Sequence, residues 1–147
     1  MRVRDILEAK EKSAIHWVSP DTSIQNLLEK LAEHNVGALI VSQDGKAVAG
    51  IVSERDVVRR LIGPDVNQHT LVSEIMTKAE SLHTASPEDT FISLTELMTE
   101  KRIRHVPIVD ETGLVGVLSI GDVVKHRMRQ LEFERDQLNS YVTDSSS

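Results

Sequence analysis

Residues 50–58 have the sequence GIVSERDVV, and residues 116–124 repeat this pattern as GVLSIGDVV. In both stretches a glycine and two aliphatic residues lead to a serine that stands three residues before an aspartate. Ser-x-x-Asp ahead of an apolar run is typical of the start of a helix, and the aliphatic residues before it are typical of a short strand. Each stretch therefore predicts a strand that turns directly into a helix.

Two further blocks recur in the same order. The sequence SPDTSI at residues 19–24 returns as SPEDTF at residues 86–91, and VRDIL at residues 3–7 returns as VSEIM at residues 72–76. Three blocks in one order indicate an internal duplication. Two copies are too few for a solenoid, so we expect two repeats packed face to face about a pseudo-twofold axis.

A helix is predicted after each Ser-Pro pair, because apolar residues recur there at helical spacing. These are Ile24, Leu27, Leu28 and Leu31 in the first repeat, and Phe91, Leu94 and Met98 in the second. Thr22 and Gln25 are placed as a capping box for the first helix, and Asp89 is the candidate cap of the second.

A two-stranded hairpin follows each of these helices. The apolar runs 38–41 and 106–109 lead into turns that contain Gly45 and Gly113, and the runs 50–52 and 116–118 come next. We expect short extended segments before the helices, at residues 15–19 and 81–86. Each repeat is then β-α-β-β-α, and the fold class is α+β with the repeats packed through their sheets.

The repeats divide the chain at a polar stretch, residues 63–69, which contains helix-stop residues. We expect the first repeat at residues 1–66, the second at 67–130, and a C-terminal helix with a frayed end at 131–147. Within residues 122–142 an apolar row near 4-3 spacing, interrupted by Arg135, comprises Val124, Met128, Leu131, Leu138 and Val142. This row indicates either a long helix that pairs with a second copy or a stripe that lies on its own domain.

Composition excludes several classes of protein. Only 3% of the 147 residues are aromatic, which argues against base stacking on single-stranded nucleic acid, and the net charge of −6 opposes general attraction to nucleic acid or anionic membranes. The absence of cysteine removes disulfides, thiolate metal sites and a cysteine nucleophile, and fits a cytoplasmic location. No apolar run approaches the ~18–20 residues that span a bilayer, and the first residues do not form a secretory signal.

The chain offers little material for catalysis. Its six histidines show no metal-site spacing, and it has no G-x-S-x-G elbow, Walker loop or G-x-G-x-x-G motif. We therefore expect no enzymatic activity and no metal, with an enzyme of unrecognised type as the weakest alternative.

The two Ser-x-x-Asp turns, Ser53 to Asp56 and Ser119 to Asp122, allow two interpretations. In the first they are capping boxes and nothing more. In the second the helix N-terminus and the aspartate form a binding site, because a carboxylate one turn into a helix accepts both hydroxyl hydrogens of a ribose. The two interpretations are compatible, since a cap would order the ribose site.

A cationic stretch, KRIRHVP at residues 101–107, precedes the second hairpin. Lys and Arg there suit the C-terminal dipole of a helix. Alternatively, Arg104 and His105 face a cleft and hold phosphate. The first repeat has uncharged Gly37 and Ala38 at the matching place, so we expect one phosphate-anchored ligand and a less charged or larger ligand at the other cleft.

These features resemble the tandem cystathionine-β-synthase (CBS) domain pair, or Bateman module. The duplicated Ser-Pro blocks, the two hairpins and the two Gly-φ-φ-Ser-x-x-Asp turns carry the resemblance over residues 3–127, and the chain looks like the small stand-alone bacterial proteins of this family. The resemblance implies regulatory binding of AMP, ADP or ATP, and in some members NAD(H) or S-adenosylmethionine, at two clefts between the repeats. It also implies a homodimer.

The resemblance further implies a role for each matching residue. The turn residues Ser53, Asp56, Ser119 and Asp122 would hold ribose, and Arg104 and His105 would meet phosphate. Adenine would lie against Ser19, Gly37 and Ala38 in one cleft and against Ser86 in the other, while Arg55 is an addition of this sequence to the first turn.

Two functions remain in view. The first is a non-catalytic sensor of energy or redox state that binds an adenine nucleotide and acts on an unidentified regulated protein. The alternative is a structural or oligomerisation module without a physiological ligand, in which the turns only cap helices and the C-terminal helix mediates assembly.

Overall fold

The first repeat has the predicted order of elements. In the computed structural model, which describes residues 1–10, 15–63, 67 and 69–145, this repeat comprises β1 (Trp17–Val18), α2 (Ile24–His34), β2 (Ala38–Val41), β3 (Gly50–Ser53) and α3 (Glu54–Leu61). β1 pairs parallel with β2, β2 pairs antiparallel with β3, and β4 (Thr77–Lys78) joins the free edge of β3. Most of the predicted linker, residues 64–66 and 68, lies outside the described residues.

The second repeat comprises α5 (Phe91–Lys101), β5 (His105–Asp110), β6 (Gly113–Ser119) and α6 (Ile120–Ser145). β5 and β6 form the predicted antiparallel hairpin. The leading strand expected at residues 81–86 is shorter than predicted: Ser81 ends the 3-10 helix η1 (Ala79–Ser81), and only Ala85 bridges in parallel to Ile108 of β5. The α+β class and the duplicated hairpins are confirmed.

The helix caps lie one residue later than predicted. The side chain of Ser23, not Thr22, caps α2 and accepts a hydrogen bond from the Asn26 backbone N–H. Thr90, not Asp89, caps α5, and Asp89 instead accepts from the backbone N–H of Ser86. Isolated bridges explain the shift, because each cap residue is held in an extended conformation by the strand-like residue opposite it.

Each repeat receives a helix from the start of the other. α1 (Val3–Ala9) packs on the second repeat, where the Val3 backbone N–H donates to the Asp89 carbonyl. α4 (Val72–Ile75) packs on the first repeat, where the Val72 backbone N–H donates to the Thr22 carbonyl. The two contacts are equivalent under the duplication, so the repeats are interlocked by their leading helices.

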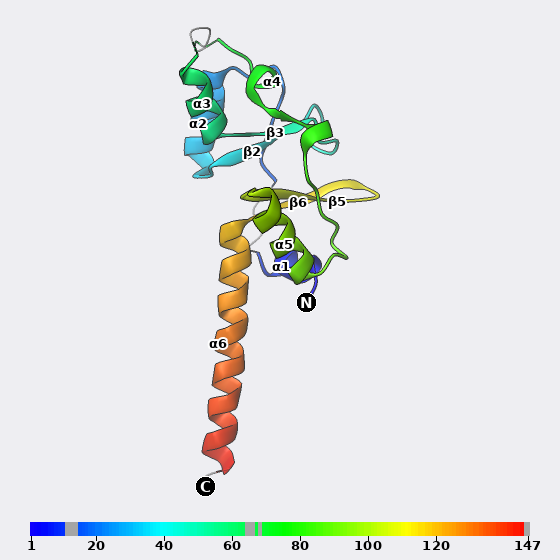
Figure 1. Ribbon diagram of the computed structural model, residues 1–147, viewed down its shortest axis with the longest axis vertical. Helices are drawn as coiled ribbons and strands as arrows, with labels where there is room; N and C mark the ends of the chain where they lie inside the picture. The colour runs from blue at the N-terminus through cyan, green and yellow to red at the C-terminus, as the bar shows by residue number, and fades with distance from the viewer. Residues whose placement is uncertain (11–14, 64–66, 68, 146–147) are drawn as a thin grey trace.

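Two apolar cores result. One core is Val3, Ile6, Ala85, Leu94, Met98, Val106, Ile108, Leu118 and Val123, and the other is Val18, Ile24, Leu27, Leu31, Leu39, Val41, Val52, Val57 and Val72. Figure 1 shows the hairpin β2–β3 facing the hairpin β5–β6 across the middle of the molecule, with helices on the outer side of each hairpin and α6 projecting away from the body. The site described next lies between these two hairpins.

Glycine is required where the packing is tightest. A Cβ at Gly50 would collide with the Thr77 carbonyl oxygen, and one at Gly116 would lie 2.7 Å from Cδ2 of Leu7. The glycine that begins each of the repeated stretches 50–58 and 116–124 thus lets β4 approach one hairpin and α1 approach the other.

Candidate functional site

A cavity of about 770 Å³ lies between the two repeats. Five of the predicted site residues line it: Gly37 and Ala38 from the first repeat, and His105, Ser119 and Asp122 from the second. Much of the remaining wall is apolar and is formed by Leu7, Ile15, Val36, Leu39, Ile40, Ile51, Val115 and Val117. The cavity therefore combines an aliphatic wall with polar side chains, which include one polar corner at Asp122, as small-molecule sites do.

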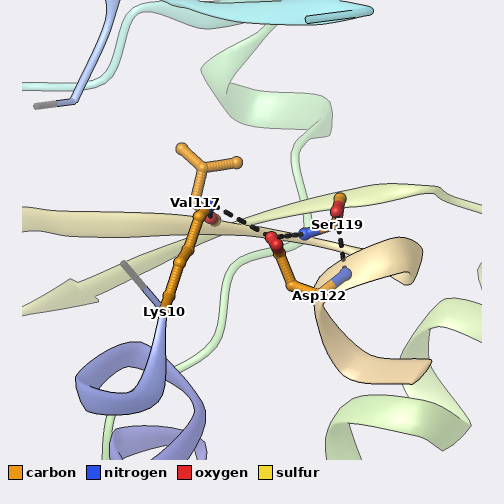
Figure 2. Close-up of polar contacts among 4 residues, drawn as sticks. All are labelled: Lys10, Val117, Ser119 and Asp122. Carbon is orange, nitrogen blue, oxygen red and sulfur yellow. Dashed lines mark hydrogen bonds and ion pairs between the residues drawn. The ribbon is translucent and has the colours of Figure 1, made fainter. Parts of the chain in front are cut away.

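The polar corner is the Ser-x-x-Asp turn between β6 and α6. The Ser119 backbone N–H donates to Oδ2 of Asp122 at 2.9 Å, and the Asp122 backbone N–H donates to Oγ of Ser119 at 3.1 Å. Both bonds are drawn in Figure 2. The capping-box interpretation is confirmed at this turn, and the cap fixes the Asp122 carboxylate at the wall of the cavity.

Lys10 completes this corner from the end of α1. Its ammonium donates to Oδ2 of Asp122 at 3.0 Å and to the Val117 carbonyl at 2.9 Å, and Figure 2 shows the side chain reaching from α1 to the strand and turn. The Lys10 and Asp122 side chains are 35% and 23% exposed, so the pair is partly shielded from solvent. The N-terminal segment is thereby connected to the same carboxylate that we expect to bind ribose.

The surroundings of Asp122 and His105 set the protonation state of both side chains. Burial raises the pKa of the Asp122 carboxyl, but hydrogen bonds from the Ser119 backbone and the Lys10 ammonium outweigh burial and hold the pKa below its usual value. Burial lowers the pKa of His105; the Asp122 charge opposes this effect, while Lys10 and Arg104 add to it. At neutral pH the corner therefore holds a carboxylate and a neutral imidazole.

The equivalent turn of the first repeat has the same geometry. The Ser53 backbone N–H donates to Asp56 Oδ2 at 2.8 Å, and Ser53 caps α3. These two residues, the exposed Arg55 and the half-buried Ser86 do not line the 770 Å³ cavity. The structure thus brings together five of the eleven predicted residues at this cavity and leaves these four elsewhere.

Ser19 and Arg104 lie near the cavity but not on its wall. Ser19 lines a neighbouring cavity of about 460 Å³, which shares Ile15, His16 and His34 with the larger one. The Arg104 side chain is exposed, and its carbonyl accepts from the Ile120 backbone N–H at 2.9 Å.

Sequence reasoning missed five polar residues of the cavity, which are Glu8, Lys10, His16, His34 and Asn35. The rings of His16 and His34 are stacked with centroids 3.6 Å apart, and burial together with the His34 charge lowers the pKa of His16. These residues match no motif, since the fold brings them together from the end of α1, the segment before β1 and the end of α2.

Comparison of the chain with models of known protein families agrees with the duplicated fold described above. The sequence profile of the CBS domain matches residues 3–63 and again residues 72–129. The chain belongs to the CBS domain family. It is a CBS pair, and the two matches correspond to the two copies of the duplication found in the sequence.

Relatives of this CBS pair include the mitochondrial CBS domain-containing protein CBSX3 of Arabidopsis thaliana, which is 36% identical over 95% of this chain and 71% of its own length. The crystal structure of the CBS-domain protein ATU1752 of Agrobacterium tumefaciens is 37% identical, covers 86% of this chain and 99% of its own, and superposes with a TM-score of 0.77. CBSX2, solved in complex with AMP, is 27% identical, covers 87% of this chain and 96% of its own, and has a TM-score of 0.72.

Two negative findings apply to the described part of this CBS pair. Its histidine and acidic side chains nowhere gather in a group of three or more suited to a metal ion. Among the same residues, no helix has the length and apolar content needed to cross a bilayer.

Proposed function

We propose that this CBS pair is a non-catalytic regulatory module that binds an adenine nucleotide of the AMP, ADP and ATP class in the cavity between its repeats. One observation carries the proposal: the Asp122 carboxylate, fixed by the capping box with Ser119, lies on the wall of a largely aliphatic cavity of about 770 Å³. A ribose binds such a carboxylate through its two hydroxyls, and aliphatic walls suit an adenine ring. The AMP complex of the relative CBSX2 supports the choice of ligand class.

The phosphate would lie at the second repeat's hairpin. His105 lines the cavity beside Asp122, and Arg104 precedes it at the surface. The Lys10 ammonium and the Ser119 backbone N–H both donate to Oδ2 of Asp122, and a ribose hydroxyl would donate to Oδ1. In this arrangement the ribose contacts Asp122, and the phosphate points toward His105 and Arg104.

The second cleft is part of the same proposal. Ser53, Asp56, Arg55 and Ser86 would form it, with the turn of the first repeat holding a less charged or larger adenine ligand. Binding at either cleft regulates a partner only if the ligand prefers one of two conformations of the pair. Homodimerisation and a cytoplasmic location also remain proposals.

Isothermal titration with AMP, ATP, NADH and adenosine tests the ligand class. Asp122→Asn should weaken every adenine ligand at the described cavity, because the neutral amide accepts ribose hydroxyls less well than the carboxylate. Asp56→Asn is the matched control, since it alters the same capping box in the other repeat. It should leave the affinity at the Asp122 cavity unchanged, and a drop from two ligands per chain to one would locate the second cleft.

Arg104→Ala separates phosphate recognition from nucleoside recognition in the same titrations. AMP should lose more affinity than adenosine. Equal losses would show that Arg104 does not hold phosphate, and no heat with any adenine ligand would contradict the proposed function as a whole.

One observation favours the alternative function, a structural module without a ligand. α6 exposes an apolar row along much of its length. If AMP, ATP and NADH all leave the melting temperature unchanged while substitutions in that row abolish assembly, the alternative is correct.

A further inference from the structure

A smaller cavity, of about 250 Å³, adjoins the candidate site. It shares Lys10 and Asp122 with the 770 Å³ cavity. Its other lining residues are Ile6, Ala9, Lys125, His126 and Arg129. The Lys10 ammonium lies 3.0 Å from Oδ2 of Asp122, so this ion pair belongs to the walls of both cavities. The proposed nucleotide would occupy only the larger cavity.

The smaller cavity lies between α1 and the first turns of α6, which pack against each other. Its α6 residues stand at positions 122, 125, 126 and 129, and steps of three and four place them on one face of the helix. Residues 125–129 have the basic sequence KHRMR, of which Arg127 and Met128 do not line the cavity. Helical spacing therefore sorts this run, and directs part of its positive charge toward α1.

The wall of this cavity carries an excess of positive charge. Lys10, Lys125 and Arg129 contribute three cations, and Asp122, which Lys10 already pairs, contributes the single carboxylate. The chain as a whole has a net charge of −6 and therefore repels anions in general. An attraction for an anion at this place must come from the local arrangement of the cations.

The donors of Lys125 and Arg129 are not used within the described part of the chain. Neither side chain forms a hydrogen bond or an ion pair with a described residue, whereas the neighbouring Arg127 donates to Oε1 of Gln130 at 2.8 Å. A guanidinium binds the oxygens of a phosphate in a bidentate manner, and an ammonium adds a compact positive charge. The two side chains thus have the chemistry of a phosphate site.

The size of the cavity favours a small anion. Cavities that hold drug-sized ligands measure about 300–1,000 Å³, and this one falls below that range. Its apolar wall consists of Ile6 and Ala9, and its one ring is the imidazole of His126, which leaves little surface for a base or a lipid chain. A phosphate ion agrees with both the size and the charge.

We propose that the cavity between α1 and α6 is a binding site for inorganic phosphate, held by Arg129 and Lys125 from α6 and by Lys10 from the end of α1. The site is independent of nucleotide binding, because neither Arg104 nor His105 lines this cavity.

Titration of inorganic phosphate into the full chain, followed by backbone amide shifts in NMR, tests the site. About 0.1 M sodium chloride screens exposed charges that are more than about 10 Å apart. Under these conditions the amides of residues 9–10 and 125–129 should shift and saturate together. Lys125→Gln with Arg129→Gln should raise the phosphate dissociation constant about tenfold or more. Absence of a saturable shift at these amides in the wild type would overturn the proposal.

A matched variant controls for general electrostatic attraction. Arg127→Gln with Arg135→Gln removes the same charge from the same helix, but neither residue lines the cavity, so the phosphate affinity should change little. An equal loss in both double variants would overturn the site. Arg104→Ala should also leave the shifts unchanged, and their loss in this variant would place the phosphate at the second repeat's hairpin instead. Circular dichroism of each variant verifies that it is folded.

Discussion

The contact between Lys10 and Asp122 sets the state of the candidate site. Lys10→Met removes a hydrogen bond and a nearby positive charge from a carboxylate that stays partly buried. Because these two interactions lower the Asp122 pKa and burial raises it, the pKa should rise in the variant. Carbon-13 NMR titration of the carboxyl measures the change, and Lys101→Met, which alters an exposed lysine at the end of α5, should leave the Asp122 pKa unchanged.

The sign of this shift also gives a dependence of stability on pH. A depressed carboxyl pKa means that the folded state binds its proton less readily than the unfolded state, whose value is about 3.9. The stabilisation that the Asp122 carboxylate gives the folded state is therefore complete above the unfolded pKa. It is lost as the pH falls through the lower pKa of the folded state. At pH 7 Lys10→Met should cost about 1 kcal/mol of unfolding free energy, and the cost should shrink below about pH 4; a constant cost would contradict the ion-pair explanation.

At the level of residues, local spacing made the Ser-x-x-Asp turn of this site predictable. Ser119 and Asp122 are three residues apart, so a motif identifies them. Lys10 reaches Asp122 across 112 positions of sequence, and His16 meets His34 only because β1 and α2 bring them together. No local pattern encodes such contacts.

At the level of elements, the corrected caps can be tested directly. Ser23→Ala and Thr90→Ala should each lower the free energy of unfolding by about 1 kcal/mol, because each removes the side-chain acceptor for an N-terminal N–H of its helix. Thr22→Ala should cost less than half as much, since Thr22 contributes its carbonyl, and not its side chain, to α4. Urea denaturation measures all three, and an equal loss at Thr22 and Ser23 would restore Thr22 as the cap.

The sequence predicted the helices and strands themselves more accurately than the residues at which they begin. Apolar periodicity identified α2, α5 and both hairpins, because burial of a continuous face requires it. The cap residue was ambiguous, since Thr22 and Ser23 are both suitable chemically and only the bridge between Ser23 and Leu71 decides between them. The surroundings of α6 were open for a similar reason: periodicity reveals an apolar row but not the surface that it faces.

At the level of the whole molecule, the duplication predicted two facing repeats but not their interlocking. Residues 3–7 and 72–76 were recognised as equivalent blocks. Nothing in these blocks indicates that each contributes to the other repeat's core, where Val3 and Val72 are both fully buried. Exchange of leading helices depends on the path of the chain between elements, which hydrophobic patterning does not encode.

This interlocking predicts that the pair unfolds as one unit. Ile6 lies in the first few residues of the chain yet belongs to the core of the second repeat. Ile6→Ala should cost about 2–5 kcal/mol, and because each core includes a helix that begins the other repeat, loss of one core should release the other. Hydrogen exchange should therefore accelerate in β2 and β3 as well as in β5 and β6, while Ile92→Ala on the exposed face of α5 should alter neither hairpin. Faster exchange confined to β5, β6 and α5 would show instead that the two repeats unfold independently. A ligand in the cavity between the repeats could then not couple one repeat to the other through a shared unfolding equilibrium.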